Sequence, residues 1–128
     1  MNKILLVEDD ELESRLYVNL FHKHGFDVLS LTNGLECHAK ALEYMPQIIV
    51  LDIMMPKMNG FDTLDVLRFD PATQKIPILV LTNLSDEHYA TEARRRGATA
   101  FLTKSNVENS ELIRQITDII SAYSAPKV

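Results

Sequence analysis

Residues 48–52 read Ile-Ile-Val-Leu-Asp, a run of four apolar residues that leads into an acid. Residues 4–8 and 78–82 repeat this arrangement, with a four-residue apolar run that leads into Glu8 in the first case and Thr82 in the second. Uninterrupted apolar runs are typical of parallel strands that are covered on both faces. If these strands are neighbours, their polar ends meet at one edge of the sheet, which is where ligands bind in open α/β sheets.

Short apolar runs alternate with longer amphipathic stretches along the whole chain, which is the pattern of βαβ units. Five such pairs can be counted, with strands expected at residues 4–7, 26–31, 48–51, 78–81 and 99–102. The last helix has the clearest apolar stripe, which consists of Leu112, Ile113, Ile116, Ile119, Ile120 and Tyr123. We therefore expect a three-layer α/β/α sandwich with helices on both faces of a five-stranded parallel sheet.

Two of the other expected helices have features that the structure can test. The first helix, which we expect to stop at Gly25, has apolar residues at helical spacing: Leu12, Leu16, Tyr17, Leu20 and Phe21. The helix over residues 85–96 has the acids Asp86 and Glu87 in its first turn and three arginines in its last, an arrangement that complements the helix dipole. We interpret these arginines as a solvated helix end. Since Tyr89, Ala90 and Ala93 are its only apolar anchors, this helix should be weakly held.

Composition and charge restrict the class of protein. The 128 residues suffice for one domain with a single core, which we place at residues 1–124 with a tail at 125–128. A net charge of -5 disfavours direct binding to nucleic acid. Cys37 is the only cysteine and is expected to fill a small apolar helix position, so a reducing compartment, the cytoplasm, is expected. No segment approaches the roughly 20 apolar residues of a membrane helix, and the first apolar run is too short for a signal peptide.

The polar residues at the expected strand ends have the chemistry that phosphoryl transfer to a carboxylate requires. Glu8 and Asp9 supply carboxylates for a cation, Asp52 is a central carboxylate, and Thr82 and Lys104 supply a hydroxyl and an ammonium. Each of these residues, taken alone, has a structural explanation. Asp52 can cap a helix, Thr82 can be an ordinary strand residue, and Lys104 can be solvated.

Four motifs together identify a family. They are Val7-Glu8-Asp9-Asp10, Leu51-Asp52-Ile53-Met54-Met55-Pro56 with Asn59-Gly60 following, Leu81-Thr82, and Phe101-Leu102-Thr103-Lys104. In this order and at these separations they resemble the receiver domain of bacterial two-component response regulators, over essentially the whole chain. The resemblance implies the flavodoxin-like strand order 2-1-3-4-5. It also implies a phosphoacceptor signalling domain rather than an enzyme.

The resemblance implies a role for each acidic residue at the site. Asp52 is the expected phosphoacceptor, and Mg²⁺ is the expected cofactor because it binds one or two carboxylates together with phosphoryl oxygens. Asp9 and Asp52 would bind it directly, Glu8 through water, and Met54 through its backbone carbonyl. Asp10 is interpreted as the cap of the following helix rather than as a ligand.

The resemblance also implies a switch. Thr82 and Lys104 would each contact an oxygen of the transferred phosphoryl group, and the Phe101 ring would exchange between outward and inward rotamers as Thr82 moves. The alternative for Phe101 is an ordinary core position. The signal would pass to a face formed by the helix at residues 85–96, the last strand and the last helix. The implied partners are a sensor histidine kinase or phosphotransfer protein and a downstream protein target, with the domain a monomer or a weak phosphorylation-dependent dimer.

Two residues depart from the family pattern. Ser105 follows Lys104 where the family usually has proline, often after a cis bond, and a cis bond before serine costs roughly 2.5–4 kcal/mol. The loop is therefore either trans or strained. Asn83 stands where a smaller residue is common and could narrow access to the acyl phosphate. With the apolar Met54 and Leu84 flanking the same approach, we expect slow loss of phosphate.

Three alternative functions can be weighed against this one. The chain could be a receiver excised from a longer regulator, although nothing follows Val128 in the chain as given. A dehalogenase-type phosphohydrolase would have a second aspartate two residues after the nucleophile, where this chain has Met54. A flavodoxin-like carrier would need a loop rich in Ser, Thr and Gly after the first strand, and the acids at residues 8–10 would repel a flavin phosphate instead. The four histidines show no metal-ligand spacing.

Overall fold

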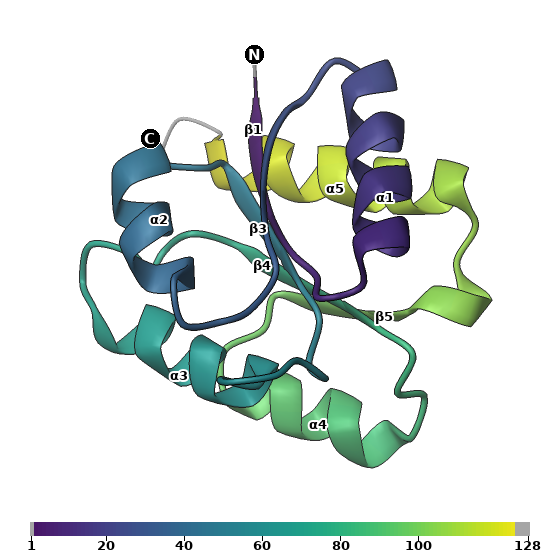
Figure 1. The fold of residues 1–128 in the computed structure, drawn as a ribbon. Helices are drawn as coiled ribbons and strands as arrows, with labels where there is room; N and C mark the ends of the chain where they lie inside the picture. The colour runs from purple at the N-terminus through teal and green to yellow at the C-terminus, as the bar shows by residue number, and fades with distance from the viewer. Residues whose placement is uncertain (1, 125–128) are drawn as a thin grey trace.

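The computed structural model describes residues 2–124, and within them five strands form one parallel sheet in the order β2-β1-β3-β4-β5 (Figure 1). Both the sheet and the strand order predicted from the sequence are confirmed. All four neighbouring pairs are parallel, and the register places Val7 opposite Leu51 and Thr82 opposite Thr103. The strands are β1 Lys3–Val7, β2 Asp27–Leu31, β3 Ile48–Leu51, β4 Ile78–Thr82 and β5 Ala100–Thr103.

Helices cover both faces of the sheet (Figure 1), as the sequence predicts. Helices α1 and α5 pack on one face, and α2, α3 and α4 pack on the other. Their bounds are α1 Glu11–Lys23, α2 Cys37–Tyr44, α3 Gly60–Phe69, α4 Glu87–Arg95 and α5 Asn109–Ser124, with a short 3₁₀ helix at Lys104–Asn106. Within residues 2–124, no helix combines the length and the apolar character that crossing a membrane requires.

The core consists of two apolar layers, one on each side of the sheet. Residues of β1, β3 and β4 alternate between these layers, so the three central strands are buried on both faces. Phe21, Leu112 and Ile116 belong to one layer, and Cys37 and Leu64 to the other. Burial raises the pKa of the Cys37 thiol to about 12, so this side chain is an apolar filler, as predicted.

Local capping explains where the helices start. The Asp10 Oδ1 accepts a hydrogen bond from the Glu13 backbone N–H at 2.9 Å, which confirms Asp10 as the cap of α1. Asp86 caps α4 in the same way, with its Oδ1 2.8 Å from the His88 N. The predicted start of α4 was therefore too early. Asp86 lies before the first turn, and Glu87 is the one acid within that turn.

Helix α1 buries less apolar surface than the sequence pattern indicates. Phe21 is fully buried, whereas Leu12 is 67% exposed and Leu16 is 60% exposed. At about 100° per residue, the nine positions from Leu12 to Phe21 correspond to roughly half a turn of rotation. The two exposed leucines therefore lie on the face of α1 that points away from the sheet. In α5, similarly, Leu112 and Ile116 are buried as predicted but Tyr123 is exposed.

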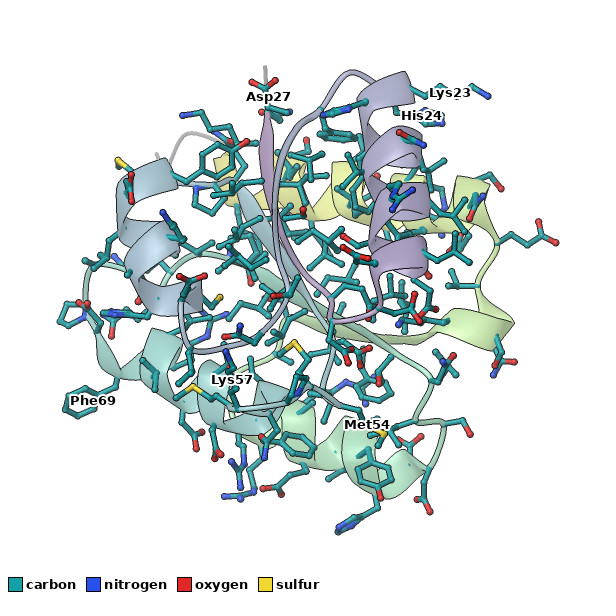
Figure 2. The ribbon with its side chains drawn as sticks, in the orientation of Figure 1. Lys23, His24, Asp27, Met54, Lys57 and Phe69 are labelled. Carbon is teal, nitrogen blue, oxygen red and sulfur yellow. The ribbon has the colours of Figure 1, made fainter. Side chains whose placement is uncertain are left out.

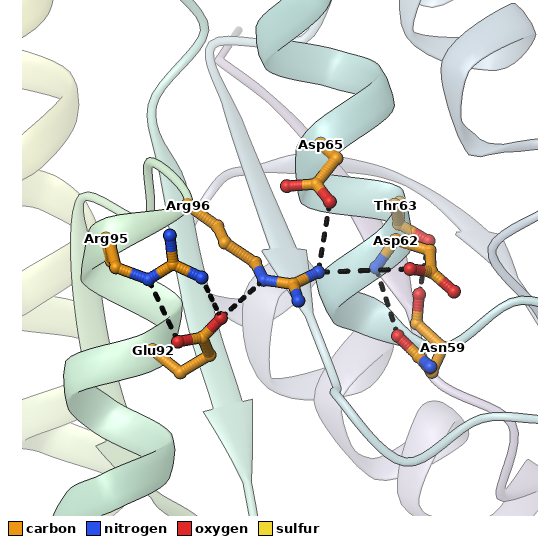
Figure 3. A network of polar contacts seen from close by, with 7 residues as sticks. All are labelled: Asn59, Asp62, Thr63, Asp65, Glu92, Arg95 and Arg96. Carbon is orange, nitrogen blue, oxygen red and sulfur yellow. Dashed lines mark hydrogen bonds and ion pairs between the residues drawn. The ribbon is translucent and has the colours of Figure 1, made fainter.

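Helix α4 contacts α3 through a polar network that the sequence did not indicate (Figure 3). Arg96, the cap of α4, reaches three carboxylates: Glu92 at 2.8 Å, Asp65 at 3.0 Å and Asp62 at 3.8 Å. Its guanidinium also lies over the Phe61 ring, 5.2 Å from the centroid. The interpretation of all three arginines as a solvated helix end was therefore wrong for Arg96. Whether α4 is weakly held stays a prediction.

Candidate functional site

The carboxyl edge of the central strands brings the predicted polar residues together. Glu8 follows β1, Asp52 follows β3 and Thr82 ends β4, and all three side chains are buried. Asp9 lies beside them and is exposed. The strands place these groups together because parallel neighbours end at the same edge, so residues far apart in sequence share one site.

An acidic triad at this edge has the donor set of a divalent-cation site. One carboxylate oxygen from each of Glu8, Asp9 and Asp52 lies within 4.8 Å of the other two. Carboxylate oxygens are hard ligands, and Mg²⁺ is bound through one or two of them together with water and phosphoryl oxygens. The Met54 backbone N–H donates to Asp52 Oδ1 at 3.2 Å, so the peptide chain beyond Asp52 is held at the site. The residues present therefore fit Mg²⁺.

Lys104 extends into the same cluster. Its Nζ donates to Asp52 Oδ2 at 3.0 Å, to Glu13 Oε2 at 3.2 Å and to Glu8 Oε1. The side chain is 5% exposed. No peptide bond among the described residues is cis, so the bond between Lys104 and Ser105 is trans. Of the two possibilities that the sequence left open for this loop, the trans form is the observed one, and in it the Lys104 ammonium contacts the Asp52 carboxylate.

The electrostatics of the cluster follow from its burial. Burial raises the pKa of the Glu8 carboxyl to about 7, although the hydrogen bonds from Lys104 and the Asp10 amide act in the opposite direction. Burial by itself lowers the pKa of Lys104, but its hydrogen bonds to Glu8 and Asp52 outweigh this and the pKa is raised. Lys104 is therefore an ammonium at neutral pH. One cation faces an excess of carboxylates, which favours the binding of a further cation.

Glu13 is the site residue that the sequence reasoning missed. It lies in the first turn of α1, where an acid is explained by the helix dipole and attracts no further interpretation. The sequence does contain one signal. Asp10 and Glu13 have the spacing of a capping box, which directs attention to the Glu13 side chain but not to Lys104.

Thr82 and Phe101, the two residues of the switch hypothesis, lie on the neighbouring strands β4 and β5. The Thr82 hydroxyl is buried and accepts a long hydrogen bond from the Leu84 N–H at 3.5 Å. Phe101 lies on the neighbouring strand β5, opposite Val80, and is half-buried against the layer that contains α2, α3 and α4. A half-buried ring is compatible both with the switch position and with a core position, so the role of Phe101 stays a prediction.

Two of the three residues expected to control access line a cavity at the mouth of the site. Met54 and Leu84 share a cavity of about 660 Å³ with Asp9, and Phe61 and Tyr89 form part of its wall. Met54 is 63% exposed, and Figure 2 shows its side chain at the surface near α4. Asn83 is exposed but does not line this cavity.

The histidines lie outside the site. Among the described residues, the acidic triad is the group of three potential metal ligands, and no histidine belongs to it. His38 instead contacts Asp70, with 2.7 Å between Nε2 and Oδ2, beside the end of α3. Figure 2 shows Phe69, the last residue of α3, projecting from the surface nearby.

Comparisons with known proteins agree with this geometry. A sequence profile of the response regulator receiver domain matches residues 4–117. The protein PilH of Pseudomonas aeruginosa is 32% identical over 121 residues, which cover 94% of this chain and 99% of PilH. The DNA-binding dual master transcriptional regulator RpaA of Synechocystis is 36% identical over 104 residues, but this match spans only 43% of that regulator.

A solved structure gives the same result. The Vibrio cholerae chemotaxis protein CheY4 superposes with a TM-score of 0.86 at 27% sequence identity, over 93% of this chain and 98% of CheY4. The family match extends over nearly the whole chain, and the acidic triad and Lys104 lie together at the carboxyl edge of the sheet. The chain therefore belongs to the family of response regulator receiver domains and is a phosphoacceptor signalling module rather than an enzyme.

Proposed function

We propose that Asp52 accepts a phosphoryl group from a histidine kinase or a phosphotransfer protein, with Mg²⁺ bound at the acidic triad. The observation that carries this proposal is the position of the Asp52 carboxylate. It lies within 4.8 Å of carboxylate oxygens of Glu8 and Asp9, and its Oδ2 is 3.0 Å from the Lys104 Nζ. A central carboxylate with a cation-binding pair on one side and an ammonium on the other is suited to phosphoryl transfer.

The chemistry assigns a role to each group. An Asp52 oxygen attacks phosphorus to form an acyl phosphate, and the bond between phosphorus and the donor atom breaks with its electron pair leaving on the donor. Lys104 and Thr82 contact oxygens of the phosphoryl group and stabilise their charge. Mg²⁺ held at the acidic triad would supply positive charge that offsets the carboxylates and the phosphoryl oxygens. Its proposed ligands are Asp9 and Asp52 directly, Glu8 through water, and the Met54 carbonyl.

The acceptor assignment is tested with a small phosphodonor. Wild-type protein incubated with acetyl phosphate and Mg²⁺ should gain the mass of one phosphoryl group, measured by intact mass spectrometry. Asp52→Asn should not gain it, and chelation of Mg²⁺ should prevent the gain in the wild type. Asp118→Asn, which removes an exposed acid on α5, is the matched control and should behave as wild type. Labelling that persists in Asp52→Asn would falsify the assignment.

We further propose that phosphorylation changes the face formed by α4, β5 and α5. Thr82 ends β4 beside Asp52, and its neighbour β5 contains Phe101. A shift of Thr82 toward a phosphoryl oxygen alters the space beside β5, in which the Phe101 ring can move. Backbone amide NMR shifts on binding beryllofluoride should therefore spread through residues 85–96 and 99–102. Shifts confined to residues that touch Asp52 contradict the switch and leave the acceptor assignment intact.

The mouth of the site supports a slow loss of phosphate. Hydrolysis needs a water molecule in line with the Asp52 oxygen, and the cavity beside Asp9 is lined by the apolar side chains of Met54 and Leu84, which cannot orient water. We expect the phosphorylated form to persist for many minutes. Asn83 is proposed to add bulk at the entrance. Decay of the phosphorylated protein after donor removal should be faster in Met54→Asn and Leu84→Glu, and equal rates in all three proteins contradict the shielding.

A second function within the family has an observation in its favour. The match to RpaA spans 43% of that regulator, whereas the match to PilH spans 99%, so similar domains occur both as parts of longer proteins and alone. The domain could therefore serve as the receiver of a longer regulator, with the same chemistry at Asp52. Four points stay predictions: the cytoplasmic location, the absence of a nucleic-acid partner, the state as a monomer or a weak phosphorylation-dependent dimer, and the division at residue 124. Residues 125–128 lie outside the described part of the chain.

A further inference from the structure

Three carboxylates accept hydrogen bonds from Lys104, and Glu13 is the one that has no role in the proposed phosphorylation. Its Oε2 accepts a hydrogen bond from the Lys104 Nζ at 3.2 Å. The other two partners, Glu8 and Asp52, are almost completely buried, whereas the Glu13 side chain is 35% exposed. Lys104 is therefore held by two buried carboxylates at the strand ends and by one that reaches solvent from α1.

The helix cap does not explain the position of the Glu13 carboxylate. In a capping box, the acid at the third helical position accepts a hydrogen bond from the backbone N–H of the cap residue. Asp10 makes its half of this arrangement, with its Oδ1 2.9 Å from the Glu13 N. The reciprocal bond, however, is made by Glu8, whose Oε2 accepts from the Asp10 N–H at 3.1 Å. Because Glu8 satisfies the cap, the carboxylate of Glu13 is available to Lys104.

The donors of Lys104 are fully used. A lysine ammonium has three N–H donors, and the three carboxylates of Glu8, Asp52 and Glu13 accept them. Phosphorylation moves the negative charge of Asp52 onto the phosphoryl oxygens, and these oxygens then compete for the donors of Lys104. Separating the ammonium from the buried Glu8 carboxylate leaves an uncompensated charge, whereas the more exposed Glu13 can exchange its bond for water at low cost.

We propose that Glu13 is a positioning residue for Lys104. It holds the third N–H of the ammonium in the unphosphorylated domain and releases it to a phosphoryl oxygen when Asp52 is modified. This inference rests on the proposed function of Asp52. Glu13 does not touch the reacting carboxylate and acts through Lys104. Because Glu13 and the phosphoryl group compete for the same donor, Glu13 slows phosphorylation.

The first test measures Lys104 in the unphosphorylated protein. With the lysine side chains labelled with ¹⁵N, the exchange of the Lys104 ammonium protons with water is followed by NMR in wild type, Glu13→Asp and Glu13→Gln. Glu13→Asp keeps the charge but is one methylene shorter. We expect faster exchange in both variants. Glu11→Gln, which removes an exposed acid in the same helical turn that Lys104 does not contact, should match wild type. Unchanged exchange in Glu13→Asp and Glu13→Gln overturns the proposal.

The second test measures the rate of phosphorylation by acetyl phosphate in the presence of Mg²⁺. Both Glu13 variants should react about two- to fivefold faster than wild type, the factor expected for one partly exposed ion pair. If Glu13→Gln is faster but Glu13→Asp equals wild type, charge repulsion alone is responsible and the positioning role is wrong. Failure of the wild type to accept phosphate would contradict the proposed function of Asp52, whereas the ammonium exchange tests Glu13 independently of it.

Discussion

Two cations in this domain each contact three carboxylates, and their surroundings differ. Lys104 lies at the carboxyl edge of the sheet with a side chain that is 5% exposed, whereas Arg96 lies between α3 and α4 and is 27% exposed (Figure 3). The partners of Lys104 directly follow β1 and β3 or lie in α1, and those of Arg96 lie in α3 and α4. They are Glu8, Asp52 and Glu13 for Lys104, and Asp62, Asp65 and Glu92 for Arg96.

The comparison shows that burial, rather than the number of contacts, decides what such a cluster does. Around Arg96, water is close, so the ion pairs are weakened by solvent and salt. Lys104, Glu8 and Asp52 have lost their water and depend on one another, so removal or addition of one charge changes the state of the rest. The buried cluster is therefore suited to respond to a phosphoryl group, and the exposed one is suited to hold two helices together.

The largest expected difference comes from removing each cation. Lys104→Met leaves buried carboxylates without their cation and should lower the free energy of unfolding by roughly 3 kcal/mol in metal-free buffer at neutral pH. Arg96→Met should lower it only by a small fraction of that, since the Arg96 carboxylates are more exposed. Urea denaturation of both variants measures this. Equal losses contradict the distinction between the two clusters.

The pH dependence of stability should have opposite signs at the two clusters. Burial raises the pKa of Glu8 from 4.5 to about 7. The contribution of Glu8 to the free energy of unfolding is therefore fully present below pH 4.5 and is lost as pH rises through 7. Metal-free wild type should therefore lose up to about 3 kcal/mol relative to Glu8→Gln over this range. The arginine hydrogen bonds, from Arg95 first, lower the pKa of Glu92 to about 2, so the contribution of Glu92 is lost only in acid. Urea denaturation across pH is the measurement, and a flat difference between wild type and Glu8→Gln contradicts the assignment.

Added Mg²⁺ should stabilise the domain through the acidic triad beside Lys104 and not through the carboxylates around Arg96. The expected gain in the free energy of unfolding is smaller than the two effects above. At a concentration ten times its dissociation constant, Mg²⁺ should raise the free energy of unfolding by about 1.4 kcal/mol. Asp9→Asn, which removes one carboxylate of the triad, should lose most of this gain, whereas Glu92→Gln should keep it. Denaturation with and without chelator measures the effect. A gain that survives Asp9→Asn would place the cation elsewhere.

The smallest expected effect concerns the attachment of α4. Arg96→Gln should increase backbone amide exchange within Glu87–Arg95 without changing the rate of phosphorylation by acetyl phosphate. Arg94→Gln is the matched control because the Arg94 guanidinium forms an ion pair with Glu87, on its own helix, at 3.8 Å. High salt should reproduce the effect of Arg96→Gln in the wild type. Hydrogen exchange followed by NMR is the measurement. Equal exchange rates in Arg96→Gln and Arg94→Gln would show that Arg96 does not hold α4.

The sequence predicted most of the fold and most of the site because both depend on local patterns. Apolar runs identified all five strands to within one residue at each end, and the polar residues after them identified Glu8, Asp52 and Thr82. The strand order needed the family resemblance. On α1, apolar spacing was compatible with more than one face of the helix, and only packing decided that Leu12 and Leu16 are exposed.

The sequence by itself determined which residues form strands and which polar groups stand at their ends, since an apolar run and the polar residue that follows it span only a few positions. The tertiary structure alone decided which carboxylates share Lys104 and which share Arg96. Glu13 and Lys104 are 91 positions apart, and Asp65 and Arg96 are 31 positions apart. Long flexible side chains select their partners by distance and burial after the elements have packed. No pattern along the chain contains that information, and for this reason Glu13 and Arg96 emerged only in the folded domain.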